Sequence, residues 1–369
     1  MNQQPGKLGI REYVSIAILM VGAKATEDTP NMLYSKVQNA AWMLPLLSSG
    51  IFFIPLYLLI KTMALYHGKD LFSVIKKILG KYFGFIVCLV IFILSSFGVS
   101  AGTRTYIDII RAFYFTSTPN VIIYAILMII SAYGAKKGLQ HIGSVSYLIV
   151  FYVLVSLYIV FYLSMQHGHI QSIFPIWGPG QLEILKQGPQ QLTLFAEFFL
   201  FAMIIPYFTS NKVFSKGTWI AYVYVSIQIS AATFLFICMF DTSLGGIGYP
   251  FHTVIRFISL GEFIPNVEII FFIIWIISAF IRFTAFLYIN ALMFGHIFKI
   301  KDFEHLIPSL ATIYLLIGSI PESPMDAGLD FKAPLTNIVG PTFAVISILL
   351  WLVALLKGEF KHAKNKNSM

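Results

Sequence analysis

The amino-acid sequence is divided into ten long apolar stretches, and this division limits the possible folds more than any other feature. A helix that crosses a bilayer needs about 20 apolar residues, and most of the stretches reach or approach that length. Mean hydropathy is +0.81 and only 11% of the residues are charged, which excludes a soluble globular fold. We therefore predict an all-α polytopic membrane protein with ten transmembrane helices, whose spans cover residues 10–32, 42–61, 82–112, 119–135, 144–165, 191–211, 217–240, 265–297, 306–320 and 335–356.

The distribution of positive charge predicts the orientation of these spans. Of the 25 lysines and arginines, 17 fall on one side of the predicted membrane, together with both termini. The opposite side holds Lys36, Arg111, Lys186, Arg256 and Lys332, and the spans themselves contain Lys24, Arg104 and Arg282. Short cytoplasmic loops carry an excess of Lys and Arg, so we expect both termini to be cytoplasmic. The net charge of +9 then indicates membrane insertion and contact with anionic lipid rather than nucleic acid.

The segments between spans leave no room for a second folded domain. We expect residues 1–369 to form one integral membrane domain that ends in a basic cytoplasmic tail, residues 358–369. Cys88 and Cys238 both lie in mid-span, where apolar surroundings keep thiols inert, so neither a disulfide framework nor a metal site is indicated. The sequence contains no nucleophile–base or metal-ligand constellation, and we expect no catalytic residues and no cofactor.

Two of the predicted spans contain interruptions. In the first span, Gly22 and Lys24 lead into the polar run Glu27-Asp28-Thr29-Pro30, and in the sixth span Glu197 is followed by Pro206. Irregular backbone at membrane depth is tolerated only where it is buried in protein or lines a cavity. Broken helices at corresponding positions of two halves are typical of inverted-repeat transporters, which predicts repeats over residues 10–166 and 190–357. An ordinary Gly kink and an ordinary Pro kink are the alternative.

Ionisable side chains within the spans are the functional candidates, because a charge in the bilayer costs about 2.5–3.5 kcal/mol on insertion scales. Lys24, Glu197 and Arg282 lie at similar depth on spans 1, 6 and 8 and are predicted to converge on one polar cavity. One alternative is a structural Glu197–Arg282 pair that only neutralises two buried charges. A second hypothesis makes Lys24 a tethered cation in place of a bound sodium ion.

Three further segments have predicted roles near the outer side. Arg104, Asp108 and Arg111 have i, i+4, i+7 spacing in span 3, which favours a helix-face ion pair, with an outer gate as the alternative. Residues 241–263 contain apolar side chains at helical spacing and predict a short amphipathic helix over the outer vestibule. Residues 174–188 are expected to cover the outer face similarly.

Several short motifs follow one another in a defined order between residues 9 and 356. They are Val21-Gly22-Ala23, Leu79-Gly80-Lys81, Thr103-Arg104, Phe174-Pro175, Ala196-Glu197, Ile205-Pro206-Tyr207, Tyr249-Pro250, Ile258-Ser259-Leu260-Gly261-Glu262-Phe263 and the stretch from Trp275 through Arg282 to Tyr288. In this order and at these spacings the chain resembles the B subunit of bacterial spore germinant receptors. That family is a permease-like branch of the amino acid–polyamine–organocation transporter superfamily.

The resemblance implies a LeuT-like fold, a 5+5 inverted repeat with broken helices 1 and 6. It also implies residence in the inner membrane of a spore and assembly with a membrane-embedded A subunit and a lipoprotein C subunit. Its ligand would be a small germinant, usually an amino acid, sugar or nucleoside. Matching the family's helix-1, span-3, helix-6 and span-8 positions predicts a ligand site of Gly22, Ala23, Lys24, Ser95, Val99, Glu197, Phe198, Leu200, Phe201, Ile281 and Arg282.

The run from Lys24 to Asp28 departs from the family pattern, which has a small or apolar stretch there. The departure indicates either a different ligand charge or a receptor that couples differently to its partners. Two functions agree with the sequence. A sensor would bind its ligand and pass the change to partner subunits, whereas a proton- or sodium-coupled transporter would move an amino acid or similar solute by alternating access.

Overall fold

The apolar stretches fold as helices, because a backbone in lipid has to satisfy its hydrogen bonds within the chain. The computed structural model describes residues 7–257 and 267–361. Within these ranges there is no β-strand, only an isolated bridge between Leu8 and Phe208. Among the described residues, seven helical segments are long and apolar enough to cross a membrane: Met43–Ala64, Lys81–Phe113, Leu139–His167, Gln181–Tyr207, Asn211–Gly246, Glu268–Phe298 and Pro324–Leu356. The predicted all-helical membrane fold is confirmed.

The other three predicted spans coincide with shorter helical segments. The first corresponds to α1 (Ile10–Val21) and α2 (Thr29–Val37), which are separate helices. The fourth corresponds to α6 (Asn120–Lys136), and the ninth to the apolar segment Phe303–Gly318, which contains α13 (Ile307–Gly318).

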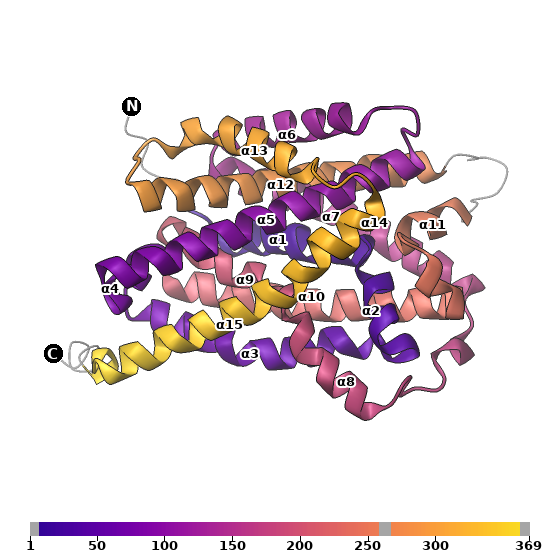
Figure 1. The fold of residues 1–369 in the computed structure, drawn as a ribbon, viewed down its shortest axis with the longest axis horizontal. Helices are drawn as coiled ribbons and strands as arrows, with labels where there is room; N and C mark the ends of the chain where they lie inside the picture. The colour runs from indigo at the N-terminus through magenta and orange to yellow at the C-terminus, as the bar shows by residue number, and fades with distance from the viewer. Residues whose placement is uncertain (1–6, 258–266, 362–369) are drawn as a thin grey trace.

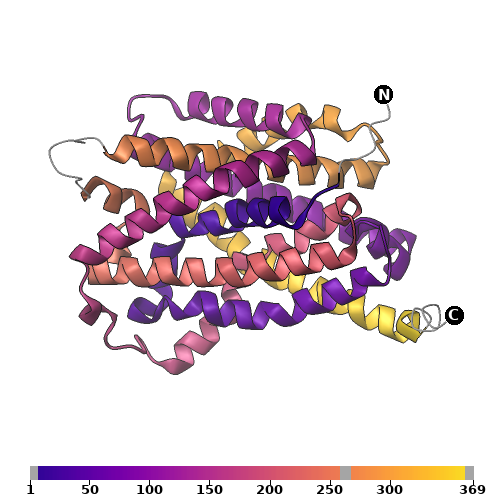
Figure 2. The same cartoon turned by 180° about the vertical axis from the view of Figure 1, so that it is seen from behind.

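The long helices form one bundle around α1 (Figures 1 and 2). Its main elements are α3 (Met43–Ala64), α5 (Lys81–Phe113), α7 (Leu139–His167), α10 (Asn211–Phe240), α12 (Val267–Phe298) and α15 (Ala333–Leu356). Helix α1 packs against α7, α10 and α12 in the middle of the bundle. Helices α6 and α13 pack together along one edge, and α3 and α10 lie side by side toward the opposite edge. The first span is thus surrounded by protein rather than lipid.

The predicted interruption of the first span is confirmed. Helix α1 ends at Val21, the chain turns tightly through the 3₁₀ segment η1 (Gly22–Thr26), and Glu27 is extended before α2 begins. Two side chains from other spans form hydrogen bonds with the break. The Gln228 amide donates to the Gly22 carbonyl at 3.3 Å, and the Trp275 indole donates to the Thr26 hydroxyl at 3.1 Å. The irregular backbone is therefore tolerated because it is buried in protein.

The interruption of the sixth span differs from the prediction. This span does not open into extended backbone at Glu197 or Pro206. It winds through the 3₁₀ segments η4 (Gly188–Phe195) and η5 (Phe201–Tyr207), with only α9 (Glu197–Leu200) as an α-helical turn between them. The only non-helical dihedrals inside η4 are at Gln191. Pro206 is the second-last residue of η5, and because its ring removes a backbone donor and cannot continue the helix, the segment ends directly after it, at Tyr207.

Two short helices cap the end of the bundle that the charge distribution predicts to be outer. The predicted amphipathic helix is present as α11 (Pro250–Phe257), with Phe251, Val254 and Ile255 buried. His252 on α11 contacts the Tyr114 hydroxyl at 3.0 Å, and burial, helped by the nearby Arg256, lowers the pKa of its imidazole to about 3. The ring is therefore neutral at physiological pH.

In residues 174–188 the structure forms α8 (Gln181–Gln187). The Ile258–Phe263 motif and residues 362–369 of the predicted tail lie outside the described residues.

Helix α15 and η4 approach each other so closely that only glycine fits at position 340. The Gly340 N–H donates to the Thr193 hydroxyl at 2.7 Å, and that hydroxyl donates to the Thr336 carbonyl. A Cβ atom added at Gly340 would lie 2.1 Å from the backbone nitrogen of Thr193. This contact holds span 6 against the last helix, with the two backbones in close approach and the Thr193 hydroxyl bonded between them.

We predict that Gly340→Ala destabilises the fold by at least about 1–3 kcal/mol, the usual cost of overpacking, because the clash is with backbone. The measurement is thermal unfolding of the purified chain in detergent. Gly50→Ala is the matched control, since a Cβ there meets nothing within 4 Å and Gly50 lies on the exposed face of α3. Equal melting temperatures for the two variants would contradict the close approach.

Candidate functional site

A cavity lies where the interruption of the first span faces span 6. Its volume is about 100 Å³, well above the roughly 10–15 Å³ that one water requires. The lining comes from η1, α2, α5, the η4–α9 stretch, α12, α15 and the segment directly before α15. Gly98 of α5 is an exposed member of that lining, so the cavity reaches the surface of the bundle beside α5. The charged residues of its lining are buried much more deeply.

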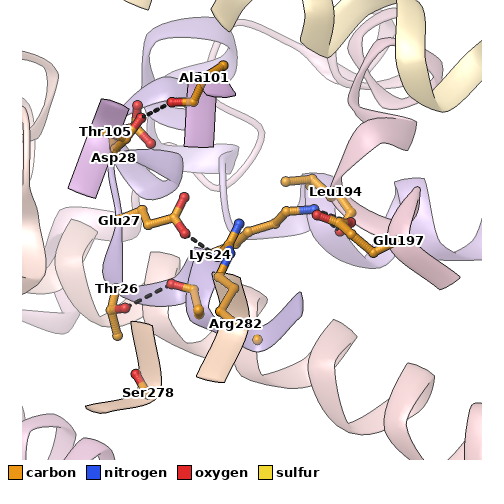
Figure 3. Close-up of polar contacts among 12 residues, drawn as sticks. Lys24, Thr26, Glu27, Asp28, Ala101, Thr105, Leu194, Glu197, Ser278 and Arg282 are labelled. Atoms are coloured by element: carbon orange, nitrogen blue, oxygen red, sulfur yellow. Dashed lines mark hydrogen bonds and ion pairs between the residues drawn. The ribbon is translucent and has the colours of Figure 1, made fainter. Parts of the chain in front are cut away.

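Lys24 binds span 6 through three hydrogen bonds. Its ammonium group donates to the Thr193 carbonyl at 3.0 Å, to the Leu194 carbonyl at 2.8 Å and to the Glu197 carboxylate at 2.5 Å (Figure 3). Lys24 and Glu197 are each 8% exposed. The cation thus occupies a cage of two carbonyl oxygens and one carboxylate, and all three of its N–H donors can be used.

Arg282 of α12 pairs with Glu27 rather than with Glu197. Its Nη1 donates to Oε1 of Glu27, the first residue after η1, and its guanidinium lies 5.6 Å from the Tyr106 ring centroid. Arg282 and Glu27 are 4% and 2% exposed. The alternative prediction of a Glu197–Arg282 pair is therefore wrong. Lys24 already holds Glu197, and the break places Glu27 next to α12 (Figure 3).

Lys332 adds a third cation that sequence reasoning assigned to an outer loop. Its ammonium group donates to Asp28 at 2.5 Å and to the Thr105 hydroxyl at 3.3 Å, and it lies 3.8 Å from Glu27. Three cations thus face three carboxylates around the break, and the group has no net formal charge. The sequence does contain an indication of this role. Lys332 directly precedes the apolar run of α15, and a cation at that position is a candidate partner for Glu27 and Asp28.

The opposite wall of the cavity is apolar. It includes side chains from α5, α12 and α15, among them Leu94, Val99, Phe283, Phe286, Val339 and Phe343. Two buried polar atoms of the lining residues have no hydrogen-bond partner within the described part of the chain, the Ser95 hydroxyl and Nε of Arg282. Because an unpaired buried polar group is costly, these two atoms are available for a ligand or for water.

Six of the predicted ligand-site residues line this one cavity: Lys24, Ser95, Val99, Glu197, Leu200 and Arg282. Gly22 and Ala23 instead line a second, smaller cavity of about 30 Å³ on the other side of the break. Phe198 and Phe201 are buried in aromatic packing against Tyr222 and Tyr13, and Ile281 is buried without lining either cavity. The predicted convergence of Lys24, Glu197 and Arg282 is present.

Arg104 and Asp108 form the i, i+4 pair that their spacing predicts, with Nε of Arg104 donating at 2.9 Å. Both side chains are buried, at 3% and 4% exposed, so they do not snorkel to the membrane surface. Arg104 also donates to the carbonyls of Gly318 at 3.2 Å and Pro321 at 2.6 Å. A cation at the end of α13 is favourable because that end of a helix carries partial negative charge. The contacts of Arg104 are with α13, not with the cavity.

The two ends of the first span are held by different contacts. At the end predicted to be cytoplasmic, the Leu8 N–H donates to the Tyr207 carbonyl at 2.8 Å, and the Tyr13 ring packs on Phe201, Phe208 and Phe214. At the other end, the Lys332–Asp28 pair ties the start of α2 to the segment before α15. The cavity thus lies between a packed aromatic cluster and an ion pair.

The arrangement of helices is similar to that of a solved membrane transporter. The structure resembles crystal structures of the Eremococcus coleocola manganese transporter. A variant of that protein aligns with a TM-score of 0.56 at 14% identity, covering 94% of this chain and 78% of the other. A complex of the same transporter with an aromatic bis-isothiourea compound aligns with a TM-score of 0.51 at 14% identity, covering 93% and 78%. At this identity the likeness concerns the fold alone.

The sequence defines the family more narrowly. The family model described as "Spore germination protein" matches residues 11–327, so the chain belongs to the spore germination protein family and, with its apolar helices, is an integral membrane protein of germinant-receptor type. It is similar to three proteins of Bacillus subtilis (strain 168). Spore germination protein KB is 22% identical over 81% of both chains, and spore germination protein B2 is 21% identical over 72% of this chain and 73% of the other. Spore germination protein A2 is 28% identical over 79% and 80%.

We predict that Arg282→Met destabilises the fold by about 3–5 kcal/mol, because it leaves the Glu27 carboxylate buried without its strongest partner. Adding Glu27→Gln should recover much of that loss, since the amide carries no charge. Glu197→Gln in the same Arg282→Met background serves as the control and should recover nothing. Thermal unfolding in detergent measures all three variants, and recovery by Glu197→Gln instead would refute the pairing.

Proposed function

We propose that the chain is the ligand-sensing subunit of a spore germinant receptor. It would bind a small nutrient, an amino acid or a similar solute, in the cavity beside η1 and signal to partner subunits without converting the ligand. The observation that carries the proposal is the cavity itself. It joins an apolar wall to buried, charge-balanced ion pairs and offers the unpaired Ser95 hydroxyl and Arg282 Nε.

The proposal includes a finer description of the fold. The chain would cross the membrane ten times as a LeuT-like pair of five-helix inverted repeats, with α1–α2 as the first span and the 3₁₀-wound segment as the sixth. The separation of α1 from α2 supports this description, because half-helices at the midplane are typical of such repeats. The bias of lysine and arginine toward one side supports cytoplasmic termini.

The relatives support the assignment to a receptor complex. All three carry the name spore germination protein. We propose that the chain resides in the inner membrane of a spore and assembles with a membrane-embedded A subunit and a lipoprotein C subunit, as the family resemblance implies.

The charge balance limits the ligand. Lys24 and Arg282 each already have a carboxylate partner, so an added net charge would remain uncompensated in a buried site. A small ligand without net charge, including a zwitterion, fits this setting best. To signal, the ligand has to bind one conformation of the bundle better than another. The contacts that can differ are the Lys332–Asp28 pair at one end and the Leu8–Tyr207 hydrogen bond at the other.

We predict that Gly98→Leu weakens ligand binding at least tenfold while the chain still folds, because the new side chain fills the cavity beside α5. The ligand is the compound that most raises the melting temperature in a screen of amino acids, sugars and nucleosides. Binding at a hundredfold excess over Kd stabilises by about 2.7 kcal/mol. Gly50→Leu is the matched control, since both glycines have nothing within 4 Å of an added Cβ and Gly50 does not line the cavity. Unchanged binding by the Gly98 variant would refute the site.

The second candidate function is a proton- or sodium-coupled solute transporter. The observation that favours it is the fold, which is shared with a protein whose name states manganese transport. Proteoliposomes containing the isolated chain separate the two functions. Under the sensor proposal, the compound identified by the thermal screen binds but does not accumulate, with or without a proton or sodium gradient. Gradient-driven accumulation would favour the transporter.

A further inference from the structure

The end of the bundle that the charge distribution predicts to be cytoplasmic contains a second concave feature. It shares no lining residue with the cavity beside the break in the first span. A groove of about 510 Å³ runs between the C-terminal end of α3 and the N-terminal part of α10. The lining residues that matter here are Tyr57, Lys61, His67, Lys212, Lys216 and Trp219. Nothing in the proposed ligand response uses them.

The groove is strongly cationic. Lys61, Lys212 and Lys216 are all exposed, and in the part of the chain that the structure describes none of them forms an ion pair with a carboxylate. The Lys61 ammonium group lies 4.7 Å from the Tyr57 ring centroid, which holds it over the groove. Three positive charges without a carboxylate among the lining residues favour an anion at this place.

The walls of the groove are held together by contacts between the two helices. The Asn211 amide at the start of α10 lies 3.4 Å from both the Met63 carbonyl and Nδ1 of His67. Farther along, the Phe53 and Trp219 rings pack with centroids 4.8 Å apart. The groove is therefore built into the packing of α3 on α10, which lie side by side in Figure 2.

An exposed apolar strip continues from the groove along the same two helices. On α10 the strip consists of Ile220, Val223 and Ile227, which are 45%, 55% and 57% exposed. On α3 it consists of Phe53 and Ile54, at 46% and 59%. Aromatic rings separate this strip from the lysines, the order found at a membrane interface, where Trp and Tyr sit at headgroup level.

We propose that this groove is a binding site for an anionic phospholipid. The three lysines hold the phosphate of the headgroup, and the acyl chains lie along the exposed faces of α3 and α10. Basic pockets between transmembrane helices on the cytoplasmic side recognise anionic headgroups in this way, and the charge distribution predicts this end to be cytoplasmic. The apolar strip identifies a lipid rather than a free phosphate, because a soluble anion would use only the lysines.

The test compares phosphatidylglycerol binding to three full-length proteins by native mass spectrometry, with phosphatidylcholine as the neutral lipid. The groove variant carries Lys61→Gln, Lys212→Gln and Lys216→Gln. Its matched control carries Lys136→Gln, Lys137→Gln and Lys301→Gln, which removes the same charge from exposed positions on the same predicted side. Each lysine near an anionic surface contributes about fivefold to affinity. The groove variant should therefore bind phosphatidylglycerol about a hundredfold more weakly than wild type, and the control should bind nearly as well as wild type.

A second measurement uses Trp219 as a probe inside the groove. Phosphatidylglycerol with brominated acyl chains should quench part of the tryptophan fluorescence, and Trp219→Phe should remove that part. Glycerol phosphate, which has no acyl chains, should compete poorly. Equal weakening by the control variant would assign the affinity to general surface charge and overturn the proposal. Strong competition by glycerol phosphate, or quenching that persists in Trp219→Phe, would overturn it as well.

Discussion

The structure depends on the neutralisation of charge inside an apolar bundle. A charged side chain at membrane depth is tolerated only with a partner or water, and this chain places three cations and three carboxylates around one break in its first helix. The break and the charges require each other. Glu27 and Asp28 can reach α12 and Lys332 only because the helix stops at Val21, and the irregular turn remains buried because those side chains hold it in place.

The same arrangement ties the sixth span to the first and the last spans. The carbonyls of Thr193 and Leu194 point to Lys24, and the Thr193 hydroxyl receives the Gly340 N–H from α15. One short stretch of span 6 is thus bonded to the first span on one side and to the last span on the other. A movement of η4 would change both contacts together. This stretch is therefore a physical connection between the cavity and α15.

Much of the architecture could be predicted from the sequence because lipid imposes simple rules. A run of apolar residues has to be helical, and a Gly followed by Lys24 inside such a run indicates an interruption. The convergence of Lys24, Glu197 and Arg282 followed from the same reasoning about buried charge. The choice of partners could not be predicted. In the sequence Glu27 is only one member of a polar run, and its distance from Arg282 depends on the path of η1. The 3₁₀ winding of span 6 and the contact at Gly340 depend on how helices pack, which no local pattern contains.

Lys24 has one further consequence. An ion bound from solution can dissociate when its concentration falls, whereas an ammonium group on a side chain is present at a fixed ratio of one per protein. The cation in the cage formed by Thr193, Leu194 and Glu197 is therefore not lost when the external sodium concentration falls. A binding site built around such a permanent charge would remain assembled in a cell that spends no metabolic energy on maintaining gradients.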